Sequence, residues 1–217
     1  KKENKNTASF LEMAIRKLET KGIHKVPDVK SFGEASDDQY FNIALELCIT
    51  WINRILFLKL LEGQLISYHK GDKSYRFLNT EMIHDFDELF KLFHNVLAVN
   101  IQDRDEKVKE KYNLVPYLNS SLFEISELED LTISIDSLDN SESFSLLSTT
   151  ILKEAKKKNS KLKTLDYLFN FLDAYDFASE GSEDIQEDNK PLINASVLGK
   201  VFERINAYKD GSIYTPG

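Results

Sequence analysis

The stretch Ser36-Asp-Asp-Gln-Tyr-Phe-Asn-Ile-Ala-Leu-Glu-Leu-Cys-Ile-Thr-Trp-Ile-Asn-Arg-Ile-Leu-Phe-Leu-Lys-Leu-Leu-Glu-Gly-Gln-Leu-Ile66 decides the fold of this chain. Apolar side chains recur through it at helical spacing and cover most of the circumference of the predicted helix. They are Phe41, Ala44, Leu45, Cys48, Trp51, Ile52, Ile55, Leu56, Leu58 and Leu60. A helix that is apolar on most sides must be covered by its neighbours, so we expect the rest of the chain to pack around it.

Five polar residues interrupt this apolar helix, namely Glu46, Asn53, Arg54, Lys59 and Glu62. A segment that crosses a lipid bilayer would rarely tolerate so many, so we expect no membrane contact. An unpaired guanidinium is very costly to bury. We therefore expect a structural ion pair at Arg54, and favour it over a contact with a ligand.

Shorter patterns flank the long helix on both sides. Thr7 has the form of a helix cap and Gly22 of a helix end. We expect further helices over 79–97, 107–112, 144–158, 164–175 and 194–205. Leu131, Ile133 and Ile135 alternate with polar residues, which predicts a strand, and residues 64–79 are either a hairpin or an extended excursion.

These patterns predict a mainly α fold, an irregular helical bundle with a minor β element. We expect three segments: an N-terminal helix and loop (1–35), a helical domain (36–208) and the start of a further region (209–217). The single cysteine, Cys48, lies on the apolar helix and has no partner for an internal disulfide, which suits a reducing cytoplasm.

The charge of the chain bears on nucleic-acid binding. Its 217 residues carry a formal net charge of −8. This charge argues against binding of this chain alone to the phosphate backbone of a nucleic acid. The exception is a lysine-rich segment, in which Lys156, Lys157 and Lys158 are candidates for contact with DNA phosphates. The alternative is that these lysines lie at a solvated helix end and contact no DNA.

A nuclease site is a further alternative that the residues leave open. It would join Glu154 and Lys156 to Asp136 or Asp139 as the first acid of a Mg²⁺ site. Glu154 falls in a predicted helix, so we favour the interpretation that Glu154 and Lys156 lie on a solvated helix face and bind no metal. The four histidines show no spacing typical of zinc ligands.

The last residues of the chain have the form of a helix start. Thr215 stands at the position of an N-cap and Pro216 at the first helical position, where no amide donor is needed. Unpaired amides at such a start attract a carboxylate or a phosphate.

Three stretches resemble bacterial DNA adenine-N6 methyltransferases, including the fused type IIG restriction-modification enzymes. Val197-Leu-Gly-Lys-Val-Phe-Glu-Arg-Ile-Asn-Ala-Tyr-Lys-Asp-Gly-Ser-Ile-Tyr-Thr-Pro216 looks like the segment just before their cofactor-binding core. Trp51 to Glu62 is similar to the family's Asn-Arg-hydrophobic helix, and Pro116 to Glu124 to its Pro-Tyr-Leu-Asn-Gly-Gly-Leu-Phe turn. The chain departs from the family at Ser120-Ser121, which replaces the glycine pair, and at Ile213, where an aromatic is common.

The resemblance implies a function for an intact parent protein. There, Ser212, Tyr214 and Thr215 would help line the pocket for S-adenosylmethionine. The family's glycine-containing cofactor loop and its Asn/Asp-Pro-Pro-Tyr/Phe element are missing from these 217 residues. We therefore expect no complete active site and no cofactor in this chain.

The expected role is that of a helical connector. It would couple the downstream methyltransferase core to an upstream part, such as a nuclease, and would help to position both on DNA. The alternative from another class is a helical adaptor that binds a protein partner and has no role with nucleic acid.

Overall fold

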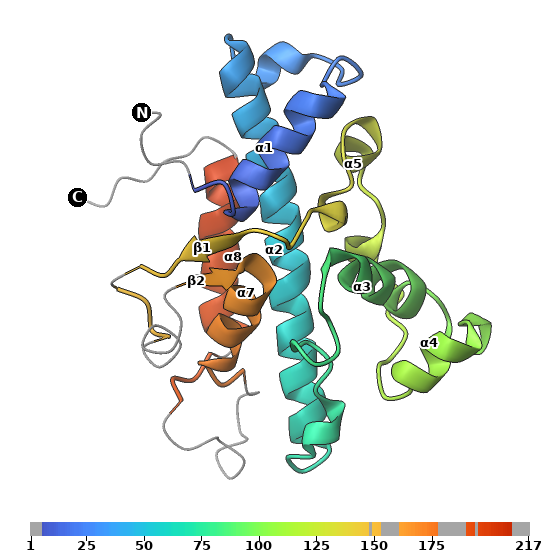
Figure 1. Cartoon of the computed structure of the whole chain (residues 1–217). Helices are drawn as coiled ribbons and strands as arrows, with labels where there is room; N and C mark the ends of the chain where they lie inside the picture. The colour runs from blue at the N-terminus through green and yellow to red at the C-terminus, as the bar shows by residue number, and fades with distance from the viewer. Residues whose placement is uncertain (1–5, 148, 153–160, 178–189, 194, 210–217) are drawn as a thin grey trace.

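The computed structural model describes residues 6–147, 149–152, 161–177, 190–193 and 195–209. Within them the chain is mainly α-helical with a small antiparallel sheet of two strands, which confirms the predicted fold class (Figure 1). The α-helices are α1 (Phe10–Lys21), α2 (Ser36–Tyr68), α3 (Phe86–Lys91), α4 (Glu106–Lys111), α5 (Glu127–Leu131), α7 (Thr164–Asp173) and α8 (Ala195–Lys209). The strands are β1 (Ser143–Ser145) and β2 (Lys161–Lys163). Short 3-10 turns join them, and a π-helix (Leu92–Leu97) follows α3.

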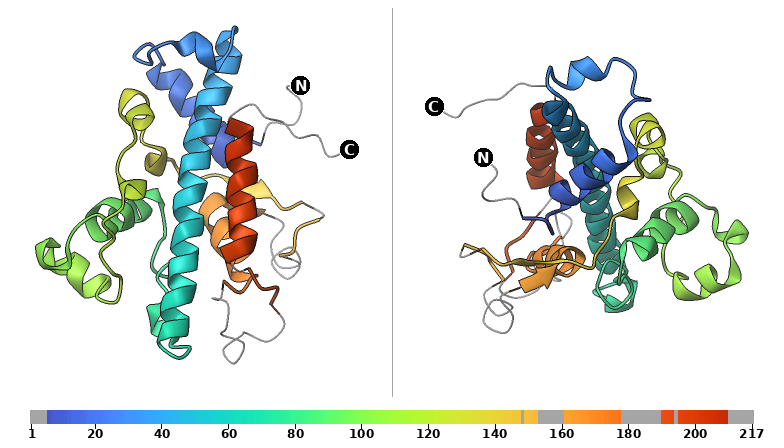
Figure 2. Two further views of the ribbon diagram at one scale, coloured as in Figure 1. Left: turned by 180° about the vertical axis from the view of Figure 1, so that it is seen from behind. Right: turned by 45° about the horizontal axis from the view of Figure 1, so that its top comes forward.

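Helix α2 is the axis of the molecule, and both views in Figure 2 show the other elements arranged around it. It has 33 residues, and its first turn carries Asp37 and Asp38, whose charges favour a helix N-terminus. The core is continuous from Met13 in α1 to Leu198 in α8. The predicted long helix is therefore confirmed. It continues to Tyr68, so residues 64–68 are neither a hairpin strand nor extended, and a 3-10 turn at Lys73–Tyr75 follows.

Helix α1 packs against α2 and begins two residues later than predicted. Ser9, and not Thr7, is the N-cap, because the Ser9 hydroxyl accepts the amide of Glu12 at 3.3 Å. The helix ends as predicted at Gly22, whose φ of 82° is the left-handed conformation that glycine adopts without strain.

The helix expected over 79–97 begins later in the structure. The side chain of Asn79 accepts the amides of Glu81 and Met82 and forms a turn instead. Helix α3 starts only after Asp85, which accepts the amide of Glu88 at 2.9 Å. Asp85, next to His84, is therefore the N-cap of α3.

Two predictions in the second half of the chain are wrong. Residues 131–136 form no strand, because Leu131 ends α5 and the next residues lead into a 3-10 turn at Ile135–Ser137. Their polar members do not face solvent, since Thr132 and Asp136 are both buried. Residues 143–145 are a strand and not the start of a helix, because they pair with residues 161–163 and place Phe144 opposite Leu162.

The last two helices agree with prediction and pack close to α2. Helix α7 occupies most of the expected range 164–175. Just beyond it, the carbonyl of Phe177 approaches Gly63 so closely that a Cβ there would lie 1.8 Å from its oxygen. Helix α8 lies beside α2 in both views of Figure 2. Its Leu198 is buried, whereas the neighbouring Val197 is 40% exposed.

None of the helices in the described ranges combines the length and the apolar composition needed to cross a bilayer.

Candidate functional site in the buried charges of helix α2

Helix α2 buries three charged side chains, Arg54, Lys59 and Glu62, within its apolar surface. Burial of a charge is tolerated only when partners replace the lost water. Each of the three has such partners, either within α2 or in segments that follow it along the chain. We call this set the buried charges of α2.

Arg54 is the centre of the larger cluster. Its two terminal nitrogens bind both carboxylate oxygens of Glu129 at 2.9 and 2.8 Å, and Nη1 also binds Asp136 Oδ2 at 3.0 Å. Its remaining donors reach the carbonyls of Leu122 and Glu124, each at 2.8 Å. All five donors of the guanidinium are thus used. The ion pair expected at Arg54 is confirmed.

The two carboxylates around Arg54 are held differently. Glu129 closes a capping box at the start of α5, where it accepts the amide and the hydroxyl of Ser126. Burial raises its pKa, but hydrogen bonds from Arg54 and Ser126 outweigh burial and hold it below its ordinary value. For Asp136 burial prevails, so its pKa is raised despite the contacts with His94, at 3.2 Å, and Arg54.

The second cluster lies further along α2. The Lys59 ammonium binds Glu62 at 2.6 Å and Asp173, in α7, at 2.7 Å. The other oxygen of Glu62 accepts the amides of Phe77 and Leu78 at 2.8 and 2.7 Å. These charges therefore fasten both the segment after α2 and the end of α7 to the central helix.

The Arg54 cluster brings together two of the three stretches that carry the family resemblance. The helix stretch 51–62 meets the turn 116–124, because Arg54 donates to two carbonyls at the end of the turn. The rings of Phe57 and Phe123 add an edge-on contact, with centroids 6.0 Å apart. Phe123 also packs against Phe93 of the π-helix. The two stretches form one polar and aromatic junction.

The Arg54 cluster holds separate segments of the fold against helix α2, and its groups are already engaged with one another. The guanidinium has no donor left for a ligand. In the part of the chain that the structure describes, Asp136 Oδ1 is the one oxygen of the two carboxylates without a hydrogen-bond partner. Across the described ranges, no three His, Cys, Asp or Glu side chains lie where they could share a metal ion.

A family model described as a domain of unknown function, DUF7814, matches residues 1–193. The chain belongs to this family. No curated protein and no solved structure matches the chain significantly. Both clusters of buried charges and the aromatic junction fall inside the range that the DUF7814 model covers.

Most of the predicted site residues of this DUF7814 chain lie outside the described residues. These are Lys156, Lys157 and Lys158 for DNA, Ser212, Tyr214 and Thr215 for the cofactor, and Glu154 for the nuclease alternative. The other nuclease candidates do not share one environment. Asp136 is buried against Arg54, whereas Asp139 is exposed and accepts the amide of Ser141 at 2.9 Å.

The sequence predicts a partner for Arg54 but does not identify it. A usable signal for Glu129 was its place three residues after Ser126, which is the spacing of a capping box. No local signal marks Asp136, because its alternation with isoleucines is typical of the polar side of a strand.

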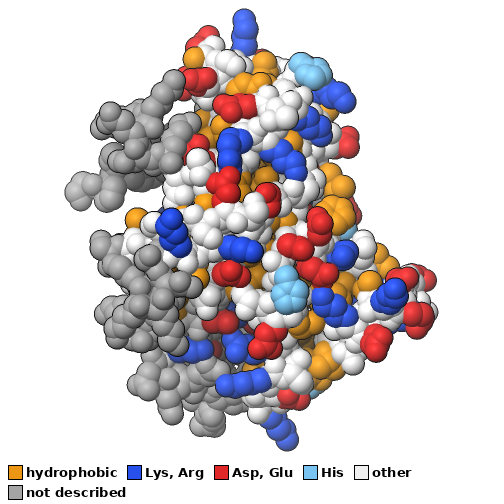
Figure 3. Space-filling view, viewed as in Figure 1, with side chains coloured by type: hydrophobic (Ala, Val, Ile, Leu, Met, Phe, Trp, Pro, Cys, Tyr) orange, Lys and Arg blue, Asp and Glu red, His pale blue; other side chains and the backbone are white. Residues whose placement is uncertain are grey.

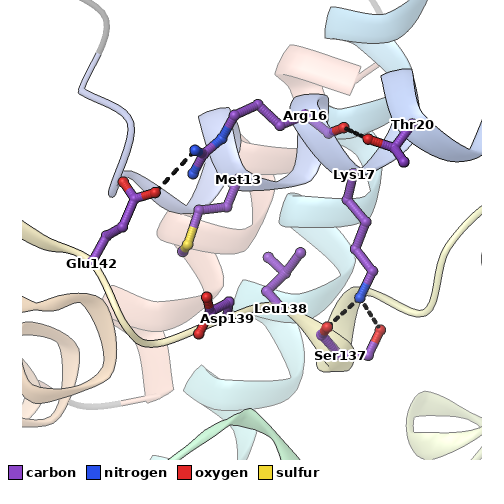
Figure 4. Close-up of a pocket in the computed structure, with 8 residues that line it drawn as sticks. All are labelled: Met13, Arg16, Lys17, Thr20, Ser137, Leu138, Asp139 and Glu142. Carbon is purple, nitrogen blue, oxygen red and sulfur yellow. Dashed lines mark hydrogen bonds and ion pairs between the residues drawn. The ribbon is translucent and has the colours of Figure 1, made fainter.

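A surface pocket of about 470 Å³ separates α1 from residues 137–142 (Figure 4). Two contacts bridge it: Arg16 to Glu142 at 3.0 Å, and Lys17 to the carbonyl and hydroxyl of Ser137. Burial and the nearby Lys21 lower the pKa of Lys17. Because both cations of the lining are engaged with partners across the pocket, these contacts hold α1 against the segment that follows α5.

Proposed function

We propose that this chain is the helical connector that precedes the methyltransferase core of a bacterial DNA adenine-N6 methyltransferase, of the restriction-modification or phage-defence type. One observation carries the proposal. The stretches 51–62 and 116–124, which resemble that family independently, contact each other through Arg54 and Phe123. Two local resemblances that form one junction support a shared architecture better than either does alone.

The connector works as a rigid support in this proposal. Helix α2 spans the molecule, and its buried charges fasten α5, α7 and the turn 116–124 to it. Helix α8 packs on the same axis and precedes Ser212, Tyr214 and Thr215 in the sequence. In the parent protein these three residues would help form the S-adenosylmethionine pocket, with Thr215 capping the helix whose first amides face the ligand.

DNA contact is a secondary part of the role and rests on Lys156, Lys157 and Lys158. On the face shown in Figure 3, Lys and Arg are interspersed with Asp and Glu and do not gather into one basic surface. The negative net charge agrees with a module that contributes few phosphate contacts of its own.

The test compares this chain with a protein extended through the downstream reading frame. We expect the extended protein to bind S-adenosylmethionine in calorimetry and to methylate adenine in DNA, and the 217-residue chain to do neither. Micromolar binding of S-adenosylmethionine to the shorter chain contradicts the proposal. A reading frame that lacks an Asn-Pro-Pro-Tyr type element downstream favours the helical adaptor instead.

The DNA contact has its own test in the extended protein. Replacing Lys156, Lys157 and Lys158 together by alanine should weaken DNA binding uniformly across sequences and reduce its salt dependence. The matched control replaces Lys107, Lys109 and Lys111 of the α4 region, an equal change in charge at another place. Unchanged affinity and salt slope in the first variant remove this part of the proposal.

A further inference from the structure

The surface pocket of Figure 4 holds a serine and a lysine in direct contact. Lys17 extends from α1 to Ser137, where its Nζ lies 2.9 Å from the hydroxyl oxygen and also contacts the carbonyl of the same residue. Both side chains are half-buried and line the pocket, whose volume of about 470 Å³ is typical of sites for small molecules. A hydroxyl, an amine and space for a substrate therefore adjoin one another.

The surroundings of Lys17 favour the uncharged form of its amine. Burial and the nearby charge of Lys21 lower the pKa of Lys17 below its ordinary value of 10.5, although the carboxylates of Asp87 and Asp139 oppose this shift. An uncharged amine has a lone pair that can accept a proton. Burial and neighbouring charges are the means by which proteins convert a lysine into a general base.

The hydroxyl of Ser137 can give its proton to this amine. A charged Lys17 donates to the Ser137 oxygen, whose own hydrogen then points to the carbonyl of Ser134, 2.7 Å away. When Lys17 is uncharged, the hydroxyl can turn its hydrogen to Nζ instead, because a hydroxyl rotates to suit its acceptors. The amine then activates the oxygen as a nucleophile, as in the serine–lysine variants of the hydrolytic triad.

The fold holds the two side chains on separate, anchored segments. Ser137 ends the 3-10 turn Ile135–Ser137, in which Asp136 is fixed in the core by Arg54 of α2. Lys17 belongs to α1, which packs along α2 and buries the neighbouring Leu18 completely. The packing of both segments on α2 therefore sets the distance between the hydroxyl and the amine, as a preorganised site requires.

We propose that Ser137 and Lys17 form a pair of nucleophile and general base that hydrolyses a small acyl ester with a good leaving group, such as an aryl ester or a thioester. Met13 and Leu138 give the pocket apolar surface for a short acyl chain. This activity is independent of the connector role, since it uses neither the junction at Arg54 nor a downstream core.

The reaction has two balanced steps. In the first, the Ser137 oxygen forms a bond to the acyl carbon, its proton passes to Nζ of Lys17, and the leaving group departs with that proton. In the second, water attacks the acyl carbon and gives a proton to Lys17, and the bond to Ser137 breaks as the hydroxyl regains its proton. The sum converts an ester and water into a carboxylic acid and an alcohol or thiol.

The first experiment treats the chain with a fluorophosphonate, whose phosphorus bonds to an activated serine as fluoride leaves. We expect one phosphonyl group per chain, located on Ser137 by peptide mass spectrometry, and no labelling of Ser137→Ala. The other serines of the chain are internal controls, because a hydroxyl without a neighbouring base is a weak nucleophile. No label, or label spread over several serines, overturns the proposal.

A substitution at Lys17 separates chemistry from structure. Lys17→Arg keeps a cation that can donate to Ser137, but a guanidinium cannot be deprotonated and so cannot act as the base. We expect its hydrolysis of 4-nitrophenyl acetate and its labelling to slow by about 100-fold or more, which is the usual contribution of a general base. Its midpoint of urea unfolding should stay close to that of the unchanged chain. Unchanged reactivity would show that the contact is structural only.

The pH profile identifies the base without a change at Lys17 itself. Labelling should become faster as the pH rises through the lowered pKa of Lys17, with a midpoint below 10.5. Lys21→Met removes a charge that lowers this pKa and should move the midpoint to higher pH. The control is Lys25→Met, whose charge is not among those that act on Lys17. A rate independent of pH, or one midpoint for all three proteins, contradicts the role of Lys17.

Discussion

Arg54 and Glu129 lie 75 residues apart in sequence and face each other in the core through two hydrogen bonds of 2.9 and 2.8 Å. Both side chains are almost wholly shielded from solvent. The planar guanidinium donates two parallel hydrogen bonds, one to each carboxylate oxygen, which fixes the relative orientation of the two side chains as well as their distance. This pair joins α5 to the central helix and so determines where the second half of the chain begins to pack.

Breaking this pair should destabilise the fold strongly. Arg54→Met leaves Glu129 and Asp136 buried without a counter-charge, and we expect the free energy of unfolding in urea to fall by about 3–5 kcal/mol. The control is Arg16→Met, which removes an ion pair whose side chains are 46% and 41% exposed. That change should cost no more than about 1 kcal/mol. Equal losses for the two variants would show that burial does not set the cost.

The two carboxyls around Arg54 should titrate in the reverse of their ordinary order. Aspartate ordinarily titrates below glutamate, at about 3.9 against about 4.3. Here the pKa of Asp136 is raised and that of Glu129 is lowered. As the pH falls, we expect Asp136 to take up its proton first in a carboxyl ¹³C NMR titration. The opposite order would contradict the assignment of burial as the dominant influence on Asp136.

These shifts have opposite consequences for acid stability. Glu129 binds its proton more weakly in the folded state than in the unfolded state. Its contribution to the free energy of unfolding is therefore complete above its ordinary pKa of about 4.3, and is lost as the pH falls through the lowered pKa of the folded state. Asp136 binds its proton more tightly when folded, so its protonation opposes that loss. We expect Glu129→Gln to lose more stability at pH 7 than at pH 3 in urea unfolding. A loss independent of pH would refute this linkage.

Gly63 should tolerate no side chain. Gly63→Ala places a Cβ 1.8 Å from the carbonyl oxygen of Phe177, which is backbone and cannot rotate away. We expect a loss of about 2 kcal/mol or more in thermal or urea unfolding. The control is Gly199→Ala in α8, where a Cβ meets no atom within 4 Å. Because alanine favours the helix, that variant should be neutral or more stable by up to about 1 kcal/mol.

Cys48 should be inert in the folded protein. It is 4% exposed, and burial raises the pKa of its thiol to about 12. Since only the thiolate reacts, we expect no labelling by a thiol reagent at pH 8 and one equivalent after unfolding in guanidinium. Rapid labelling without denaturant would place Cys48 at the surface and contradict the packing of α2.

Local signals in the sequence were sufficient where an element depends on its own residues. The long helix over 36–66 followed from apolar side chains around most of its circumference, and the end of α1 from Gly22. The need for an ion pair at Arg54 followed from the cost of burying its charge alone. These inferences required no knowledge of other parts of the chain.

Local signals failed where a distant partner decides the outcome. Residues 131–136 have the alternation of a strand, but the Asp136 side chain lies in the core because it forms an ion pair with Arg54 there. Residues 143–145 have no strong preference of their own and became a strand by pairing with residues 161–163. The surface pocket between α1 and residues 137–142 is likewise invisible in sequence, since two segments far apart along the chain form it.

The sequence by itself determined that this protein is built of helices around one long apolar helix, because the spacing of apolar residues sets which surface each helix must bury. Only the tertiary structure decided which charges meet in the core, how the stretches 51–62 and 116–124 join, and where the pockets lie. The physical reason is that burial energy depends on local pattern, whereas an ion pair, a close backbone approach or a cavity depends on the positions of atoms that the chain brings together from far apart.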